Sequence, residues 1–199
     1  MHLQAWLMDL VLEPSLAEAL MDHILDIHLA IIGQMLEAVG DDIDVVLYAD
    51  DVAFQDRLMT SPEIYRRLIK PRQRRLFDFL KARTKAKILY HTCGAVYPLI
   101  GDFIEFGLDI LNPIQTTAQG MDIERLKQEF GQDLCFWGGI DLQQLLPHGS
   151  PAEVAAVTRE IIACLGAGGG YVLSAANNIQ ADVPPQNILA MVEAVISIA

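Results

Sequence analysis

Apolar positions along the chain follow two alternating patterns. Short and nearly continuous apolar runs, rich in branched and aromatic residues, are typical of β-strands that are covered by helices. Longer segments place an apolar residue at every third or fourth position, which is the period of an amphipathic α-helix. The predicted strands are residues 44–51, 86–94, 108–115, 134–141 and 171–178. The predicted helices are residues 15–40, 61–84, 96–107, 121–131, 150–170 and 184–198.

Residues that start and stop helices lie at the boundaries of these segments. Ser15 with Glu18, and Ser150 with Glu153, have the spacing of a capping box at a helix N-terminus. Gly40 follows the first of these helices and predicts its end, because glycine readily adopts the backbone conformation found after a last helical turn.

The second long helical segment contains a proline and most of the basic residues. Ser61 predicts its N-cap, and Pro71 is expected to kink or break it because proline lacks the N–H that a helix interior needs. Its Arg-rich part, residues 66–76, has charges interleaved with apolar residues at helical spacing, which indicates the solvated face of a helix.

Strand and helix alternate five times, which predicts an α/β fold with parallel strands. An open doubly wound sheet and part of a (β/α)8 TIM barrel both have this pattern. No glycine-rich phosphate loop follows the first strand, which disfavours a nucleotide-binding open sheet. No linker or low-complexity segment appears, so we expect a single domain over residues 1–199.

Polar residues at the strand ends favour the barrel. In a barrel all the carboxyl ends converge on one rim, where active sites lie. The polar residues at these five ends are Asp50, Asp51, His91, Cys93, Asn112, Gln115, Asp141, Asn177 and Asn178. A barrel needs eight strands and about 250 residues, so we expect this chain to be the C-terminal part of a barrel with two unpaired edge strands.

Composition narrows the class of protein further. The chain is 52% hydrophobic and 20% charged, which indicates a globular protein. Its net charge of −12 disfavours nucleic acid as a partner. No uninterrupted apolar stretch is long enough to predict a membrane span, and residues 1–14 lack the positive start of a signal peptide. Three cysteines, an odd number, predict reduced thiols and a cytoplasmic location. Cys135 and Cys164 are expected to be small apolar fillers.

His91 and Cys93 are the first candidates for chemistry. Residues two apart on a strand point to the same side, so both are expected to face the interior of the barrel at its rim. Imidazole nitrogen and thiolate sulfur are natural zinc ligands, and a catalytic zinc has three protein ligands and an open position. Packing and a thiol nucleophile are the alternative interpretations of the same pair.

Three aspartates at the rim are candidate catalytic groups. Asp50 and Asp51 are adjacent, so only one of them can face inward, as a general base or a metal ligand. An ordinary turn that uses Asp for local hydrogen bonds explains them equally well. Asp141 follows Gly138 and Gly139, which predict close approach of a neighbour or a ligand.

Four segments together resemble the uroporphyrinogen decarboxylase superfamily: "YHTCGAVYPLI", "DILNPIQ", "FWGGID" and "GGGYVLSAANNIQADVPPQNILAMVEAV". The resemblance covers nearly the whole chain and implies the C-terminal half or more of a (β/α)8 barrel. The superfamily contains decarboxylases without a metal and zinc-dependent methyltransferases, which move methyl groups between corrinoid proteins and thiols such as coenzyme M.

The H-x-C-G segment is similar to the methyltransferase branch. This resemblance implies that His91 and Cys93 are zinc ligands, that the third ligand position falls at Asn177, and that a corrinoid protein is a partner. Asn is a poor zinc ligand, so Asp50 or Asp51 would have to complete the set. The remaining rim residues are assigned to the substrate; they are Asn112, Gln115, Asn177 and Asn178.

Two further interpretations stay open. One is uroporphyrinogen decarboxylation in porphyrin biosynthesis, although none of the rim positions carries the Arg or Lys that an acidic tetrapyrrole requires. The other is an inactive fragment, or one that is completed by a partner or by a second copy of the chain through the open barrel edges.

Overall fold

Five parallel strands form one sheet in the computed structural model, which describes residues 2–40 and 42–197. The strands are β1 (Val45–Ala49), β2 (Lys87–His91), β3 (Ile110–Ile114), β4 (Cys135–Ile140) and β5 (Tyr171–Ala175). They lie side by side in chain order, β1-β2-β3-β4-β5. A doubly wound sheet reverses its strand order at a switch point, whereas a barrel keeps the chain order, so the barrel prediction is confirmed.

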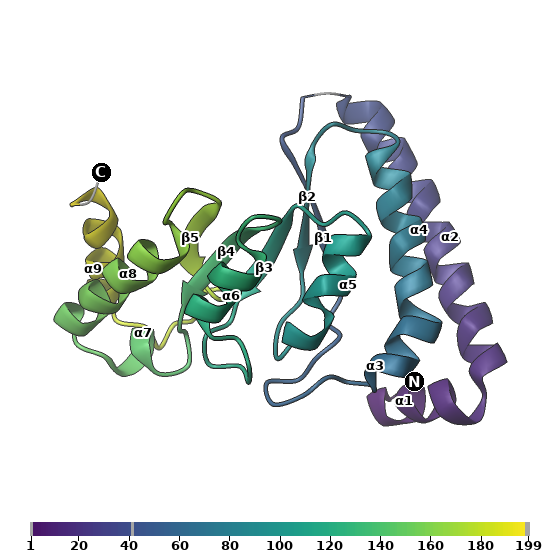
Figure 1. Cartoon of the computed structure of the whole chain (residues 1–199), viewed down its shortest axis with the longest axis horizontal. Coiled ribbons are helices and arrows are strands. Elements are labelled where there is room, and N and C mark those ends of the chain that lie inside the picture. Colours follow the sequence, from purple (N-terminus) through teal and green to yellow (C-terminus); the bar gives the residue numbers. More distant parts are fainter. Residues whose placement is uncertain (1, 41, 198–199) are drawn as a thin grey trace.

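Helices precede, separate and follow the strands along the chain, and those between consecutive strands pack on one face of the sheet (Figure 1). They are α1 (Leu3–Leu12), α2 (Pro14–Val39), α3 (Pro62–Ile64), η1 (Tyr65–Ile69), α4 (Lys70–Lys81), η2 (Tyr97–Leu99), α5 (Ile100–Glu105), α6 (Ile123–Phe130), α7 (Leu145–His148), α8 (Pro151–Leu165) and α9 (Pro185–Ile196).

Side chains of β2 show how the two faces of the sheet differ. Ile88 and Tyr90 are fully buried on the helix side, where the Tyr90 ring packs edge-on against Phe77 of α4 and Phe103 of α5. The opposite face would line the interior of a closed barrel, and at β1 it is bare, since Leu47 is 62% exposed.

The glycine pair in β4 allows the close packing that the sequence predicts. Gly138 has a φ of +128°, and a Cβ there would lie 2.7 Å from the backbone nitrogen of Ile114 on β3. Gly139 has a φ of +99°, and a Cβ there would lie 3.0 Å from the Tyr171 hydroxyl. Neighbours, rather than a ligand, occupy the space that these glycines leave.

One of the two predicted capping boxes is confirmed and the other is wrong. Ser150 accepts a hydrogen bond from the Glu153 amide, and the Glu153 carboxylate accepts one from the Ser150 amide. The helix assigned to residues 15–40 begins at Pro14 instead, and the Ser15 side chain makes no capping bond. Proline at a first helical position needs no hydrogen-bond acceptor for its nitrogen, so the start shifts toward it. Gly40 ends this helix as predicted, with a φ of +59°.

Proline distorts the second long helix without ending it. Ser61 caps the N-terminus by accepting from the Ile64 amide, as predicted. The five residues of η1 then form a π-helical turn, and α4 continues through Pro71 to Lys81. In a π-helical turn each amide bonds to the carbonyl five residues before it instead of four. This local change of hydrogen-bond partner lets the helix continue although Pro71 has no N–H.

The Arg-rich segment at residues 66–76 binds other helices. Arg72 is only 15% exposed and pairs with Asp22 of α2, at 2.8 Å, and with Glu18, at 3.3 Å. Arg66 and Lys70 pair with Asp102 of α5. The predicted solvated face therefore contributes much of the charge pairing that holds α2 and α5 against it.

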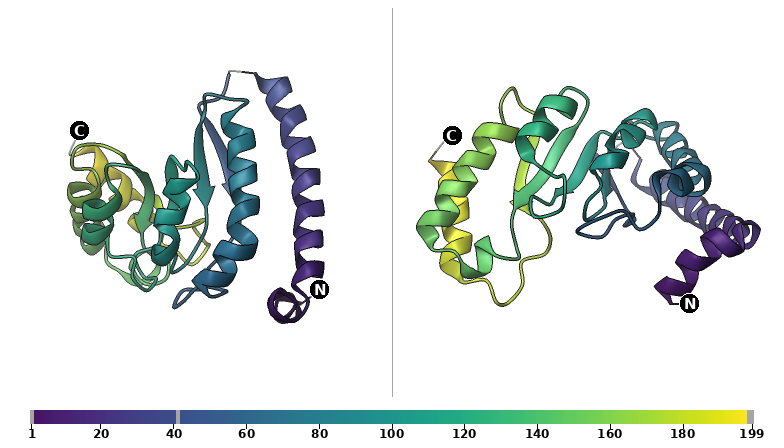
Figure 2. Two further views of the ribbon diagram at one scale, coloured as in Figure 1. Left: turned by 45° about the vertical axis from the view of Figure 1, so that its right-hand side comes forward. Right: turned by 60° about the horizontal axis from the view of Figure 1, so that its bottom comes forward.

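The expectation that no segment is long and apolar enough for a membrane span is wrong for α2. Its 26 residues pass that test on length and mean hydropathy, which is 1.3 over the best window. A core helix of a protein passes the same test, but only 17% of this window is buried. Helix α2 lies alongside α4 (Figure 2), and Leu25 and Leu36 are among its buried residues.

Candidate functional site

The carboxyl ends of the strands bring His91 and Cys93 together at the rim. His91 is the last residue of β2, and Cys93 follows it on the same side of the chain. The Cys93 Sγ lies 3.6 Å from the His91 Nε2, and both side chains are half-buried. The prediction that this pair opens to the rim is consistent with the geometry.

Asn112 fixes the orientation of the His91 ring. The Asn112 Nδ2 donates to the Trp137 carbonyl on β4 at 3.3 Å, so its Oδ1 faces the other way and lies 2.6 Å from the His91 Nδ1. An amide oxygen only accepts, so this network assigns the imidazole proton to Nδ1. The Nε2 lone pair is then directed toward Cys93, as in a metal-binding histidine with an outer hydrogen-bond partner.

Three acceptors hold the backbone that carries Cys93. The Cys93 amide donates to Asp51 Oδ1 at 2.8 Å, and the Gly94 amide donates to Gln115 Oε1 at 3.0 Å. The Ala95 amide donates to the Phe54 carbonyl at 2.8 Å. The loops after β1 and β3 therefore fix the position of the thiol from two sides.

Gly94 is required for this arrangement. Its φ is +95°, and a Cβ there would lie 2.4 Å from the Phe54 oxygen. Real Cβ atoms do not approach backbone oxygens so closely, and other residues are strained at this φ. The glycine of the H-x-C-G segment is therefore explained by the loop that packs against it.

Asn177 lies beside the thiol as a hydrogen-bond donor. Its Oδ1 accepts from the Asn178 amide at 2.7 Å, which leaves its Nδ2 facing the Cys93 Sγ at 3.7 Å. Burial raises the pKa of the Cys93 thiol, and the nearby Asp51 carboxylate raises it further, while the bond from Asn177 acts in the opposite direction.

A cavity of about 400 Å³ opens beside Cys93. Its walls come from the loops after β3, β4 and β5, and they consist largely of amides and hydroxyls; the lining residues are Cys93, Gln115, Thr116, Thr117, Asp141, Leu142, Gln143, Ala176, Asn177, Asn178 and Gln180. Three of the four predicted substrate-binding residues line it, and Asn112 instead supports His91.

Asp141 lines the cavity with its carboxylate already engaged. Its Oδ1 accepts from the Gln143 amide, and its Oδ2 accepts from the amides of Gln144 and Leu145, at 2.7 to 3.0 Å. This is the arrangement that an ordinary turn would have, in which an aspartate accepts hydrogen bonds from the backbone that follows it.

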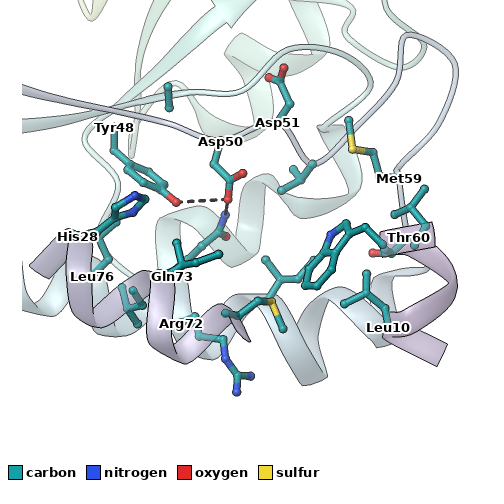
Figure 3. A pocket seen from close by; sticks show the side chains of 18 of the residues that line it. Leu10, His28, Tyr48, Asp50, Asp51, Met59, Thr60, Arg72, Gln73 and Leu76 are labelled. Atoms are coloured by element: carbon teal, nitrogen blue, oxygen red, sulfur yellow. Dashed lines mark hydrogen bonds between the residues drawn. The ribbon is translucent and has the colours of Figure 1, made fainter. Parts of the chain in front are cut away.

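Asp50 points away from the rim site. Its Oδ2 accepts from Tyr48 and Gln73 on the helix side of β1, where it lines a second cavity (Figure 3). Burial raises the pKa of the Asp50 carboxyl above its ordinary value. The sequence predicts that only one of the adjacent aspartates can face inward, and Asp51 is the one that contacts the Cys93 segment.

A loop contact across the rim has no signal in the sequence. Gln55, in the loop after β1, and Gln143, after β4, exchange two amide hydrogen bonds of 2.8 and 2.9 Å. The Gln119 amide also donates to the Gln55 carbonyl. The loop after β1 thus crosses the ends of β2 and β3 and closes one side of the rim. Two glutamines 88 positions apart carry no local pattern that would reveal this contact.

The residues at the rim fit part of a zinc site. Nitrogen and sulfur ligands bound at about 2.0 and 2.3 Å at tetrahedral angles lie about 3.5 Å apart. The His91–Cys93 separation of 3.6 Å agrees with this value. Among residues 2–40 and 42–197, however, no three His, Cys, Asp or Glu side chains gather as a ligand set. Asp50 lies on the helix side of β1 and Asp51 accepts from the Cys93 amide, and neither forms a three-ligand group with the pair.

Three comparisons with known proteins agree with one another. The uroporphyrinogen decarboxylase (URO-D) family model matches residues 1–198. A methylated-thiol--coenzyme M methyltransferase of Methanosarcina mazei is 28% identical over 182 residues, which are 92% of this chain and 45% of the relative. The solved structure of a methyltransferase from Methanosarcina mazei has a TM-score of 0.77 at 21% identity, covering 98% of this chain and 53% of that one. This chain therefore spans about half the length of these relatives, and it belongs to the uroporphyrinogen decarboxylase (URO-D) family.

Proposed function

We propose that this chain carries the zinc- and thiol-binding side of a URO-D family methyltransferase, which moves a methyl group between a corrinoid and a thiol. The observation that supports the proposal most is the Asn112–His91–Cys93 arrangement, with its separation of 3.6 Å between the two candidate ligand atoms. The relative with 28% identity is named for transfer to a thiol, coenzyme M, which agrees with this assignment.

His91 and Cys93 would hold the zinc. A bound zinc lowers the pKa of a thiol that enters its open position and so supplies a thiolate near neutral pH. A catalytic zinc normally has three protein ligands, and the described residues supply two of them.

The remaining rim residues orient these ligands and the substrate. Asn112 keeps the His91 Nε2 free of a proton, and Asp51 and Gln115 hold the backbone at Cys93 and Gly94. The Asn177 amide donates toward the Cys93 sulfur, which stabilises its ionised form. The neighbouring cavity, lined by amides and hydroxyls, would bind the polar part of the thiol substrate.

Metal analysis of the purified protein tests this proposal. We expect about one zinc per chain in the wild type, loss of zinc in Cys93→Ser, and retention in the matched variant Cys135→Ser, whose half-buried thiol lies at the start of β4. A wild type that binds no zinc, or zinc that Cys93→Ser leaves unchanged, would contradict it.

Decarboxylation of an acidic tetrapyrrole is less well supported. A substrate with several carboxylates needs cationic side chains, and none of the described residues that line the rim cavity is Arg or Lys. Incubation with uroporphyrinogen, followed by coproporphyrin fluorescence, tests this alternative. We expect no product from this chain.

A further inference from the structure

Among residues 2–40 and 42–197, no strand pairs with the outer edge of β1. The Asp50 amide donates to the His91 carbonyl of β2. Amides alternate in direction along a strand, so those of Val45, Leu47 and Ala49 point to the open side of β1. Val45 and Leu47 also expose their side chains, at 38% and 62%. Bare edges of this kind are rare in native proteins because they pair readily with another strand.

An exposed apolar stripe runs along α2 beside that edge. Leu16, Ile24, Ile27, Ile31 and Met35 recur every three or four residues or at twice that spacing, and each is at least 43% exposed. We define these five residues as the α2 stripe. At about 1.5 Å per residue, the 26-residue helix is about 39 Å long. The α2 stripe extends along most of this length, so it forms a continuous apolar surface rather than scattered exposed side chains.

The α2 stripe is separate from the face by which α2 packs on α4. Leu25 and Leu36 are buried in the main core, and Ala17 is buried beside Leu10 and Leu68. In a (β/α)8 barrel each helix packs on the strands that it connects as well as on the next helix. The α2 stripe therefore has the place and the length of a surface that covers a strand.

A cavity of about 440 Å³ lies between the helices and the edge of β1 (Figure 3). Trp6, Leu10 and Leu25 are among its apolar walls, which come from α1, α2 and α4. At its polar side, Asp50 accepts hydrogen bonds from Tyr48 and Gln73. This space lies between the helical layer and the strand layer, where a closed barrel is packed with side chains.

We propose that the β1 edge, the α2 stripe and this cavity form one docking surface for the three-stranded remainder of a URO-D barrel. Eight strands close such a barrel and five are present, so three are required. The last of them would pair in parallel with β1 beneath α2, and its outward side chains would fill the cavity. The solved relative, of which this chain covers 53%, is long enough to contain such a segment.

The surface also specifies the chemistry of the incoming strand. Its outward positions must be large and apolar to meet Trp6, Leu10 and Leu25. The position that reaches Asp50 is expected to carry a hydroxyl or a cation, because the incoming strand would cover a carboxylate that is exposed in this chain.

Other occupants agree less well with the charges and the strand count. Residues 2–40 and 42–44 contain no Lys or Arg, so this part of the surface offers no cation to an anionic lipid surface. A second copy would give ten strands, two more than a closed barrel holds.

Complementation tests the proposal. The probe is the part of the Methanosarcina mazei methyltransferase that this chain does not match, produced as a separate polypeptide. Light scattering after size exclusion measures assembly, and hydrogen exchange measures protection of the Leu47 amide. The test variant is Ile24→Asp with Ile27→Asp in the α2 stripe. The matched control is Ala19→Asp, at a residue that is also exposed on the same helix and lies outside the stripe.

We expect a 1:1 complex, with exchange at Leu47 slowed at least tenfold, for the wild type and for Ala19→Asp. The stripe variant should fold as the wild type does, because both side chains are exposed, and should bind at least tenfold more weakly. Three results would overturn the proposal: no complex, a complex that ignores the stripe variant, or a stripe that instead mediates self-association or binding to phosphatidylglycerol vesicles.

Discussion

Replacing Asn112 by Leu tests whether it positions His91 for a metal. The substitution removes the acceptor that lies 2.6 Å from the His91 Nδ1 and leaves the half-buried ring free to rotate or to change tautomer. Loss of such outer partners typically costs 10–100-fold in metal affinity, or about 1.4–2.8 kcal/mol. We therefore expect Asn112→Leu to weaken zinc binding by that factor in a competition titration with a chelator.

Two controls separate positioning from a general loss of structure. Asn112→Asp keeps an oxygen acceptor and places a negative charge behind the zinc ligand, so its zinc affinity should equal or exceed that of the wild type. Asn178→Leu removes a rim amide that has no side-chain bond to His91 and should bind zinc normally. Equal zinc affinity in Asn112→Leu and the wild type, with both folded by urea denaturation, would refute the reasoning.

Three further predictions concern stability. Gly94→Ala should lower the free energy of unfolding by more than about 2 kcal/mol in urea, because its Cβ would lie 2.4 Å from a backbone oxygen at a φ of +95°. Ser150→Ala should cost about 1 kcal/mol through its lost cap, whereas Ser15→Ala should stay within about 0.5 kcal/mol; equal effects on Tm would contradict the two helix starts. Burial alone would raise the pKa of Asp102, but two basic partners from η1 and α4 outweigh it and lower that pKa. The stabilisation by Asp102 is therefore present above its ordinary pKa of about 3.9 and is lost as the pH falls below it, so Asp102→Asn should lose less Tm between pH 5 and pH 2 than the wild type does.

Local patterns predict the strands and most helix ends because those depend on neighbouring residues. Strand β2 lies within the predicted range 86–94, although it ends at His91, three residues early, and Ser150 caps its helix through a residue three positions away. The start of α2 was missed because two adjacent signals compete there, and Pro14 takes the first helical position ahead of Ser15. Helix α1 has no side-chain cap at its N-terminus, and the predicted helices do not include it.

The candidate site was predictable only in part. The spacing of His91 and Cys93 places them on one side, and the geometry agrees. The partners of Asn112 depend on the register between β3 and β4, which brings the Trp137 carbonyl beside it and is invisible in one sequence. The direction of Asp50 likewise depends on Gln73, which α4 delivers from 23 positions away.

The zinc K-edge absorption spectrum of the metal-loaded chain tests the central claim most directly. The account predicts one protein sulfur at about 2.3 Å and an imidazole nitrogen at about 2.0 Å, a second sulfur when a thiol substrate is added, and loss of the protein sulfur in Cys93→Ser. A zinc shell without sulfur, or one that neither the added thiol nor Cys93→Ser alters, would contradict it.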